Sequence, residues 1–315
     1  MGAKLSRKNL PRQDDDNMVL KFNSYIKLPS HSSGGFDHAD VHLQSGTVFV
    51  AHTANGTVEI IDGLKNNHIS TIEDCPEASG VLCAQKENIV FAASRGTGKV
   101  IVIDANTHDV LRELKVGPKP NGLAWDTRHK KLLVADVNTF QALLLDPNLR
   151  GVLATSKLPG RPRWCIYDAA LDLFLVNILD PPGLAVLSSN DLVQNNFLPV
   201  SAAGPHGLDL ESTGRPFIAC DGKKIILLDI KNGHELSSVS IKGEPDVIWY
   251  NGKRNLLYCA MGKSGIIEVI DTKEFMITDE IKTEDGAHTI AFNQNTQHLY
   301  AFLPQSCRAA VYEEA

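Results

Sequence analysis

The sequence has little aromatic content and no long apolar run. Aromatic side chains make up 6% of the 315 residues, and no stretch approaches the roughly 18 uninterrupted apolar residues of a membrane span. Lysine and arginine together number 31 against 37 aspartates and glutamates, which gives a formal net charge of −6. We therefore expect neither a basic face for nucleic acid nor an aromatic platform for stacking bases. The remaining composition, 43% hydrophobic and 22% charged, is typical of a folded soluble protein.

Cysteine is also scarce, and no two cysteines form a C-x-x-C pair. In a chain of this length, six scattered cysteines indicate free thiols inside strands rather than a disulfide framework.

The N-terminus lacks the apolar segment of a secretory signal, so we expect a cytoplasmic protein. Residues 1–17 read as a disordered leader, basic at first and then acidic. The first six residues match the pattern for N-myristoylation at Gly2, and a basic set would add an electrostatic contact with a membrane surface: Lys4, Arg7, Lys8 and Arg12. The alternative is a leader without an acyl chain.

A repeat of about 40 to 43 residues runs through the chain. Its most regular unit is a short run of apolar, often β-branched residues that ends in a turn, found at 57–62, 99–104, 141–146, 184–188, 224–229, 266–271 and 308–312. Two further apolar runs precede each copy and an alternating polar run follows it, with Gly, Asn, Asp and Pro between them. Four strands per repeat and seven repeats predict an all-β, seven-bladed β-propeller with four-stranded antiparallel blades.

The two ends of the chain predict how the ring closes. The last repeat, 287–315, has only three strands, and an unassigned strand-like segment lies at 18–28. If this segment supplies the missing fourth strand, two exposed sheet edges disappear. The sequence therefore predicts a single propeller domain over residues 18–315, closed by pairing its N-terminal strand with the C-terminal blade.

Residues 88–122 resemble the YVTN-type propeller repeat in their sequence of strand, turn, strand and Pro-x-Gly, and residues 264–273 repeat its strand and turn. This resemblance implies the same seven-bladed fold. It implies no single function, because propellers of this type include surface proteins, binding proteins and enzymes.

A ring of polar side chains is expected at one mouth of the central channel. Residues that begin the innermost strand occupy equivalent positions in every blade and meet around one axis. Counting back from each second strand gives His38, Ser79, Asn121, Arg163, His206, Asp246 and His288. The ends of the second strands add His52, Ser94, Asp136, Asn177, Asp221 and Met261.

Histidines and an aspartate in adjacent blades are suitable metal ligands. We expect His38, His206, Asp246 and His288 to hold a divalent ion (zinc, iron, copper, calcium or magnesium), if any is bound. Gluconolactonase-like propeller hydrolases are similar in placing a cation at the channel mouth, but their ligands are typically Glu, Asn and Asp. Only Asn121 and Asp246 match those types, and the other positions depart from that pattern.

Three functions follow from the same ring. The first is binding of a small ligand, metal or peptide, with Asn121, Arg163, Trp164, Asn177 and Asp221 as contacts and Arg163 as a clamp for a carboxylate or phosphate. The second is a metal-dependent hydrolase or lyase, in which His52, Asp136 or Arg163 would assist catalysis. The third is an interaction scaffold whose channel holds only water.

Overall fold

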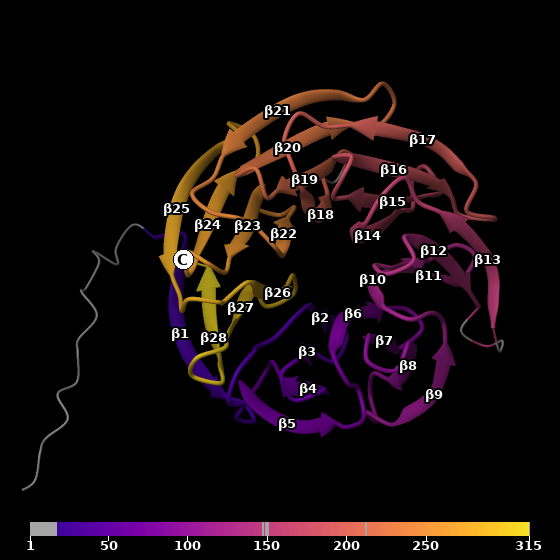
Figure 1. Cartoon of the computed structure of the whole chain (residues 1–315). Helices are drawn as coiled ribbons and strands as arrows, with labels where there is room; N and C mark the ends of the chain where they lie inside the picture. The colour runs from indigo at the N-terminus through magenta and orange to yellow at the C-terminus, as the bar shows by residue number, and fades with distance from the viewer. Residues whose placement is uncertain (1–17, 147, 149–150, 212, 315) are drawn as a thin grey trace, which may run out of the picture.

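The computed structural model describes residues 18–146, 148, 151–211 and 213–314, which form 28 strands in seven four-stranded sheets. Every sheet is antiparallel, and the sheets stand as blades around one axis (Figure 1). The all-β, seven-bladed propeller expected from the repeat is therefore confirmed. The expected leader and Gly2 lie outside the described residues.

Blades 1 to 6 each follow the chain from the innermost strand outward. Blade 1 contains β2 (Ala39–His42), β3 (Thr47–His52), β4 (Thr57–Asp62) and β5 (Asn67–Ile72), and blade 2 contains β6 (Ala78–Ala84), β7 (Ile89–Ser94), β8 (Lys99–Asp104) and β9 (Val110–Lys115). Blade 3 contains β10 (Pro120–Asp126), β11 (Lys131–Asp136), β12 (Gln141–Leu145) and β13 (Val152–Lys157), and blade 4 contains β14 (Pro162–Asp168), β15 (Leu173–Ile178), β16 (Gly183–Ser188) and β17 (Gln194–Pro199). Blade 5 contains β18 (Pro205–Leu210), β19 (Pro216–Cys220), β20 (Lys224–Asp229) and β21 (His234–Ser240), and blade 6 contains β22 (Ile248–Asn251), β23 (Leu256–Met261), β24 (Ile266–Asp271) and β25 (Met276–Lys282).

Blade 7 joins the two ends of the described chain. It contains β26 (Thr289–Asn293), β27 (His298–Leu303) and β28 (Arg308–Glu314), with β1 (Leu20–Lys27) as its outermost strand. The β1–β28 ladder runs from the Leu20–Glu314 pair to the Lys27–Arg308 pair. In Figure 1 the indigo β1 lies beside the yellow β28, and the closure predicted from the sequence is confirmed.

The core lies between neighbouring blades. The third strands, such as β4 and β8, are almost wholly buried because both of their faces pack against side chains of adjacent sheets. The outermost strands alternate instead: β21 has one exposed and one partly buried residue in turn, since only its inner face meets the core. This layering explains why the third strand carries the clearest apolar signal in each repeat.

In many of the hairpins, an aspartate or asparagine near the end of the first strand accepts backbone hydrogen bonds from the turn. The Oδ1 atom of Asp62 accepts hydrogen bonds from the backbone N–H groups of Leu64 and Lys65, and Asp104 does the same for Asn106 and Thr107. A residue at positive φ then completes such turns, as Asn66 does at 52°. These side chains stabilise the turns that set the register of each blade.

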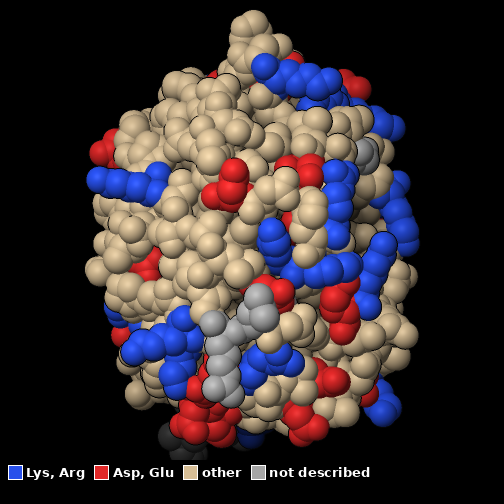
Figure 2. All heavy atoms as spheres, turned by 90° about the vertical axis from the view of Figure 1, so that its right-hand side faces the viewer, with Lys and Arg blue, Asp and Glu red and all other residues tan. Residues whose placement is uncertain are grey.

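The outer rim carries both signs of charge. Figure 2 shows the side of the ring that lies at the right of Figure 1, where lysines and arginines are next to carboxylates and uncharged surface lies between them. None of the described residues forms a helix of the length and hydropathy that crossing a bilayer would require. The six cysteines are free, and all but Cys307 are buried.

Candidate functional site

The ring residues at the channel mouth are directed by irregularities at the start of the first strands. In blades 2 to 5 the pairing between first and second strands shifts at Ser79, Asn121, Arg163 and His206. A bulge leaves the extra residue unpaired and redirects its side chain. The four side chains thus leave the pleat of their sheets at the same level of the channel.

A glycine directly after the ring residue lets neighbouring blades approach. A Cβ atom on Gly207 would lie 2.3 Å from the carbonyl oxygen of Asp246, and one on Gly122 would lie 2.6 Å from that of Arg163. These distances are too short for any side chain, so glycine is required where the ring residue of the next blade passes. The close approach of blade 3 to blade 4 and of blade 5 to blade 6 therefore depends on the glycines of the Pro-x-Gly sequences at 120–122 and 205–207.

His206 lies at the centre of the polar site. Its Nδ1 is 3.0 Å from Oδ1 of Asp221, and its Nε2 is 3.0 Å from Oδ1 of Asp246. Burial alone lowers the pKa of His206, but the two carboxylates outweigh it and raise the pKa to about 9. At neutral pH His206 is an imidazolium that donates one hydrogen bond to each aspartate.

Asp246 links His206 to the histidines of the neighbouring blades. Its Oδ2 is 3.8 Å from Nε2 of His288. Burial opposes the charge of Asp246, yet His206, His288 and His38 together hold its pKa well below the usual range. The Nδ1–H of His288 donates to the carbonyl oxygen of Gly286 at 2.8 Å, which leaves Nε2 facing Asp246.

A second group of contacts extends from His38 to blade 3. Nδ1 of His38 is 2.5 Å from Oδ1 of Asp37, and Oδ2 of Asp37 is 3.1 Å from the Arg95 guanidinium. Arg95 also donates to Oδ1 of Asn121 at 3.0 Å. The His38 ring stacks on Trp164 with 3.8 Å between ring centroids and 10° between ring planes. Because these rings come from blades 1 and 4, their stack crosses the channel.

Arg163 is loosely held beside His206. One of its terminal nitrogens is 3.6 Å from Oδ2 of Asp221, and the other is 3.3 Å from Nε2 of His206. Since that nitrogen of His206 already donates to Asp246, it is a poor acceptor for Arg163. Desolvation, together with the charges of Arg163 and Arg95, lowers the pKa of Arg161, so three guanidiniums share this side of the mouth.

A cavity of about 340 Å³ contains this site, and the side chains lining it carry both signs of charge. Its lining includes Arg163, His206, Asp221, Asp246, Lys263 and His288. A neighbouring cavity of about 350 Å³ shares Gly286 and His288 with it and extends toward His31. The structure therefore brings Arg163, His206, Asp221, Asp246 and His288 to one hollow, with His38 linked through Asp246.

Three other candidate site residues form hydrogen bonds with backbone groups. The Asp136 carboxylate accepts hydrogen bonds from the backbone N–H groups of Lys119, Asn138 and Thr139. The Asn177 amide donates to the carbonyl oxygens of His206 and Gly207. The Ser79 hydroxyl, fully buried, lies 3.2 Å from the carbonyl oxygen of Pro120. These side chains support the inner strands and do not line the mouth cavity.

His52 belongs to a separate buried chain of hydrogen bonds. Its Nδ1 lies 2.9 Å from Oε1 of Glu59, and its Nε2 lies 2.7 Å from Nδ1 of His31. Burial opposes the charge of Glu59, but His52, His68 and two threonines lower the pKa of this carboxyl to about 2. His52 does not line the cavity that contains His206.

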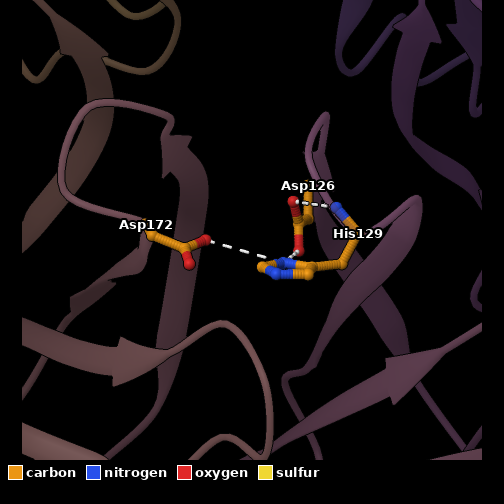
Figure 3. A group of neighbouring side chains, drawn as sticks. All are labelled: Asp126, His129 and Asp172. Atoms are coloured by element: carbon orange, nitrogen blue, oxygen red, sulfur yellow. Dashed lines mark hydrogen bonds and ion pairs between the residues drawn. The ribbon is translucent and has the colours of Figure 1, made fainter.

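Asp126, His129 and Asp172 form a cluster on the opposite face, at the β10–β11 and β14–β15 turns (Figure 3). Nδ1 of His129 is 2.7 Å from Asp126 and 3.6 Å from Asp172. A histidine and two carboxylates are a reasonable donor set for a divalent ion. However, Arg128 already pairs with Asp172 at 3.2 Å, which supplies the positive charge that a cation would bring.

Sequence reasoning missed Asp37, Arg95 and Arg161 at the mouth, and did not group Asp126 with His129 and Asp172. A signal for Arg95 was present, because it directly follows the second strand of blade 2 as Asp221 follows that of blade 5. Asp37 and Arg161 precede the innermost strands of blades 1 and 4. Counting a single position per blade overlooked these neighbours of the ring.

Comparisons with known proteins do not assign the chain to a family, so the fold is assigned from the structure alone. No protein-family model and no curated protein matched the chain. The fold is therefore established as a seven-bladed β-propeller by its strand pairing, and the similarity to YVTN-type repeats stands as a resemblance.

Proposed function

We propose that this propeller binds a small molecule bearing a carboxylate or a phosphate in the cavity at the channel mouth. The observation that carries this proposal is the incomplete pairing of Arg163 next to two further guanidiniums. Within the described part of the chain, the terminal nitrogens of Arg163 make only a 3.6 Å contact with Asp221 and a 3.3 Å contact with the His206 nitrogen that already donates to Asp246. An anionic ligand would accept from these two nitrogens in the bidentate geometry that carboxylates and phosphates favour.

The charges already present at the mouth are compatible with the binding of such an anion. Asp221 and Asp246 both accept from the His206 imidazolium, and Asp37 pairs with Arg95. The His206 imidazolium balances one of its two aspartates, and Arg163, 3.6 Å from Asp221, balances the other. Among these groups Arg161 is then the cation without a carboxylate partner, and an anionic ligand would relieve its repulsion from Arg163 and Arg95.

Metal-dependent hydrolysis at the same ring is the second candidate, supported by the orientation of His288. A hydrogen bond from Nδ1 to a backbone carbonyl, with Nε2 facing a carboxylate, is the arrangement often found for a histidine ligand. His206 fits this function less well, because both of its ring nitrogens contact carboxylates. Asp246 and His288 would then be the protein ligands, with His38 nearby.

The resemblance to YVTN-type repeats is compatible with a binding role and brings no fixed set of catalytic residues. A peptide with an acidic side chain or a free carboxyl end would present the same group as a small carboxylate. Cytoplasmic residence and acylation at Gly2 stay predictions from the sequence.

Calorimetric titration with succinate and with inorganic phosphate tests the first candidate. We expect binding by the unaltered protein and at least about tenfold weaker binding by Arg163→Gln, because a charge-assisted hydrogen bond contributes about 1.5 to 3 kcal/mol. Lys231→Gln is the matched control, since it removes one positive charge from an exposed turn between β20 and β21. Equal affinities of the two variants would contradict the proposal.

The same titration with Zn²⁺ and Mn²⁺ alone tests the second candidate. Stoichiometric binding that is lost in His288→Ala and kept in Arg163→Gln would favour the metal site. Metal binding that is unchanged in His288→Ala would rule out this metal site.

A further inference from the structure

The central channel contains a second cavity with a different chemistry from the mouth. It has a volume of about 410 Å³ and is walled by the innermost strands. Apolar side chains from six different first strands line it, among them Val41, Val81, Leu123, Ile166, Leu208 and Ile248. Cavities of this size and character are typical of sites for small organic ligands.

All three tryptophans of the chain line this cavity. Nε1 of Trp125 donates to the Glu87 carboxylate at 3.0 Å, and Nε1 of Trp249 donates to the carbonyl oxygen of Ile290 at 2.9 Å. The third, Trp164, is stacked on His38. These contacts hold the indole rings in place, and indole faces attract organic cations.

The cavity opens on the face opposite the mouth. Its lining includes Lys86, Thr127 and Ala169, which are exposed residues of the first hairpin turns of blades 2, 3 and 4. Toward the mouth it ends at the His38–Trp164 stack, and Asp246 is the residue shared by the linings of both cavities. A ligand in the channel would therefore enter from the face that does not carry Arg163.

Two aspartates, Asp40 buried and Asp209 partly buried, line this cavity from opposite sides of the ring. Asp40 on β2 accepts from the backbone N–H groups of Val41 and Cys83, and Asp209 on β18 accepts from those of Leu210 and Tyr250. Burial raises the pKa of Asp40 to about 7 and that of Asp209 to about 6, and the charge of Asp209 adds to the shift at Asp40. In the described part of the chain, neither carboxylate has an ion pair with a lysine or arginine.

The charged residues of the lining are unbalanced. Asp40, Glu87, Asp209 and Asp246 are acidic, and Lys86 at the entrance is basic. Since Glu87 pairs with Lys130 and Asp246 with His206, the acidic groups of this lining without a basic partner among the described residues are Asp40 and Asp209. A ligand that brings its own positive charge would compensate them, whereas an anion would add to the repulsion.

We propose that the channel cavity is a binding site for a small organic cation, an ammonium group carried on an aromatic or branched apolar body. The apolar body would contact the strand residues and the tryptophan faces, and the ammonium would lie between Asp40 and Asp209. This site is independent of the anion site proposed at the mouth.

Intrinsic fluorescence tests the proposal, because every tryptophan lies at the cavity. The background is Trp164→Phe, in which Trp125 and Trp249 remain to report on the part of the channel away from the mouth. We expect 2-phenylethylamine to change the emission with saturation, 2-phenylethanol to bind at least about tenfold more weakly, and 3-phenylpropanoate not to compete. Equal binding of the amine and the alcohol, or tighter binding of the carboxylate, would overturn the proposal.

Two variants locate the site, and a third separates it from the mouth. Asp209→Asn should weaken binding of 2-phenylethylamine at least about tenfold and change the affinity for 2-phenylethanol by less than about twofold, because the substitution removes only the charge. If this variant fails to fold, Ala169→Phe serves instead: the change is at an exposed entrance residue and should exclude both probes. Arg163→Gln should leave binding of 2-phenylethylamine unchanged even where it abolishes anion binding. If this variant also loses amine binding, the amine binds at the mouth and the channel site is overturned.

Discussion

At the scale of single residues, His206 determines the charge state of the mouth. Its imidazole is placed between two carboxylates, and the attraction to Asp246 and Asp221 exceeds the cost of burying the charge. A protonated histidine donates from both ring nitrogens and offers no lone pair to a metal. For this reason the structure favours an anion site built around Arg163 over a metal site centred on His206.

The pH dependence of stability provides a test of this charge state. The pKa of His206 is about 9 in the folded protein, above its ordinary value of 6.5, so the folded state binds more protons between these values. The stabilisation is therefore fully present below pH 6.5 and is lost as the pH rises through 9. We expect the difference in unfolding free energy between the unaltered protein and His206→Gln to shrink by on the order of 2 kcal/mol across this range.

Urea unfolding at pH 6.5, 7.5, 8.5 and 9.5 measures this difference directly. Other groups titrate in both proteins and largely cancel. A constant difference at all four values would show that His206 is neutral in the folded state.

At the scale of secondary-structure elements, the first strands decide where the ring side chains lie. Their bulges release His206 and Arg163 from the pleat, and Gly207, which follows His206, permits close contact with the next blade. The ring positions were predicted by counting back from the second strand of each repeat, and this count needed no coordinates. The bulge itself was not predictable, because one extra residue in a strand leaves no mark in an apolar pattern of period two.

Gly207→Ala tests the role of this close contact. The added Cβ would lie 2.3 Å from the carbonyl oxygen of Asp246, so the first strands of blades 5 and 6 must separate. We expect a loss of about 2 to 3 kcal/mol in unfolding free energy and weaker anion binding at the mouth.

Gly252→Ala is the matched control for this substitution. Its nearest neighbour is a Tyr250 ring carbon at 3.4 Å, an ordinary contact, so the unfolding free energy should change by less than about 0.5 kcal/mol. Similar losses in the two variants would refute a special role for the approach at Gly207.

At the scale of the whole molecule, closure through β1 makes the ring continuous. The β1–β28 ladder joins segments almost 290 residues apart in the chain and covers the edge that β28 would otherwise expose. Leu20 and Ile26 anchor β1 and are 1% and 2% exposed. Since the mouth site combines residues of blades 4, 5, 6 and 7, its geometry depends on the ring staying closed.

Ile26→Ala measures how much this closure stabilises the protein. Truncating a buried isoleucine removes apolar burial and leaves a cavity, so we expect a loss of about 2 to 4 kcal/mol in chemical unfolding. Lys21→Ala, at an exposed position of the same strand, should change the free energy by less than about 0.5 kcal/mol. An equally small effect of both changes would mean that β1 contributes little to the ring.

The amino-acid sequence by itself determined the number of blades, the strands in each and the closing strand, and it predicted seven ring positions, of which Arg163, His206, Asp246 and His288 line the mouth cavity. These follow from a period of about 42 residues, because alternation and turn residues are local properties that repeat in every blade. Tertiary structure alone decided which ring residues are in contact. It also decided that Asp136 and Asn177 hydrogen-bond to backbone groups, whereas Arg95 and Asp37 pair at the mouth. The stack of His38 on Trp164, which closes the channel, likewise follows only from the tertiary structure. Such contacts form between blades and depend on bulges and on distances of a few ångströms across the axis, which no pattern within one repeat records.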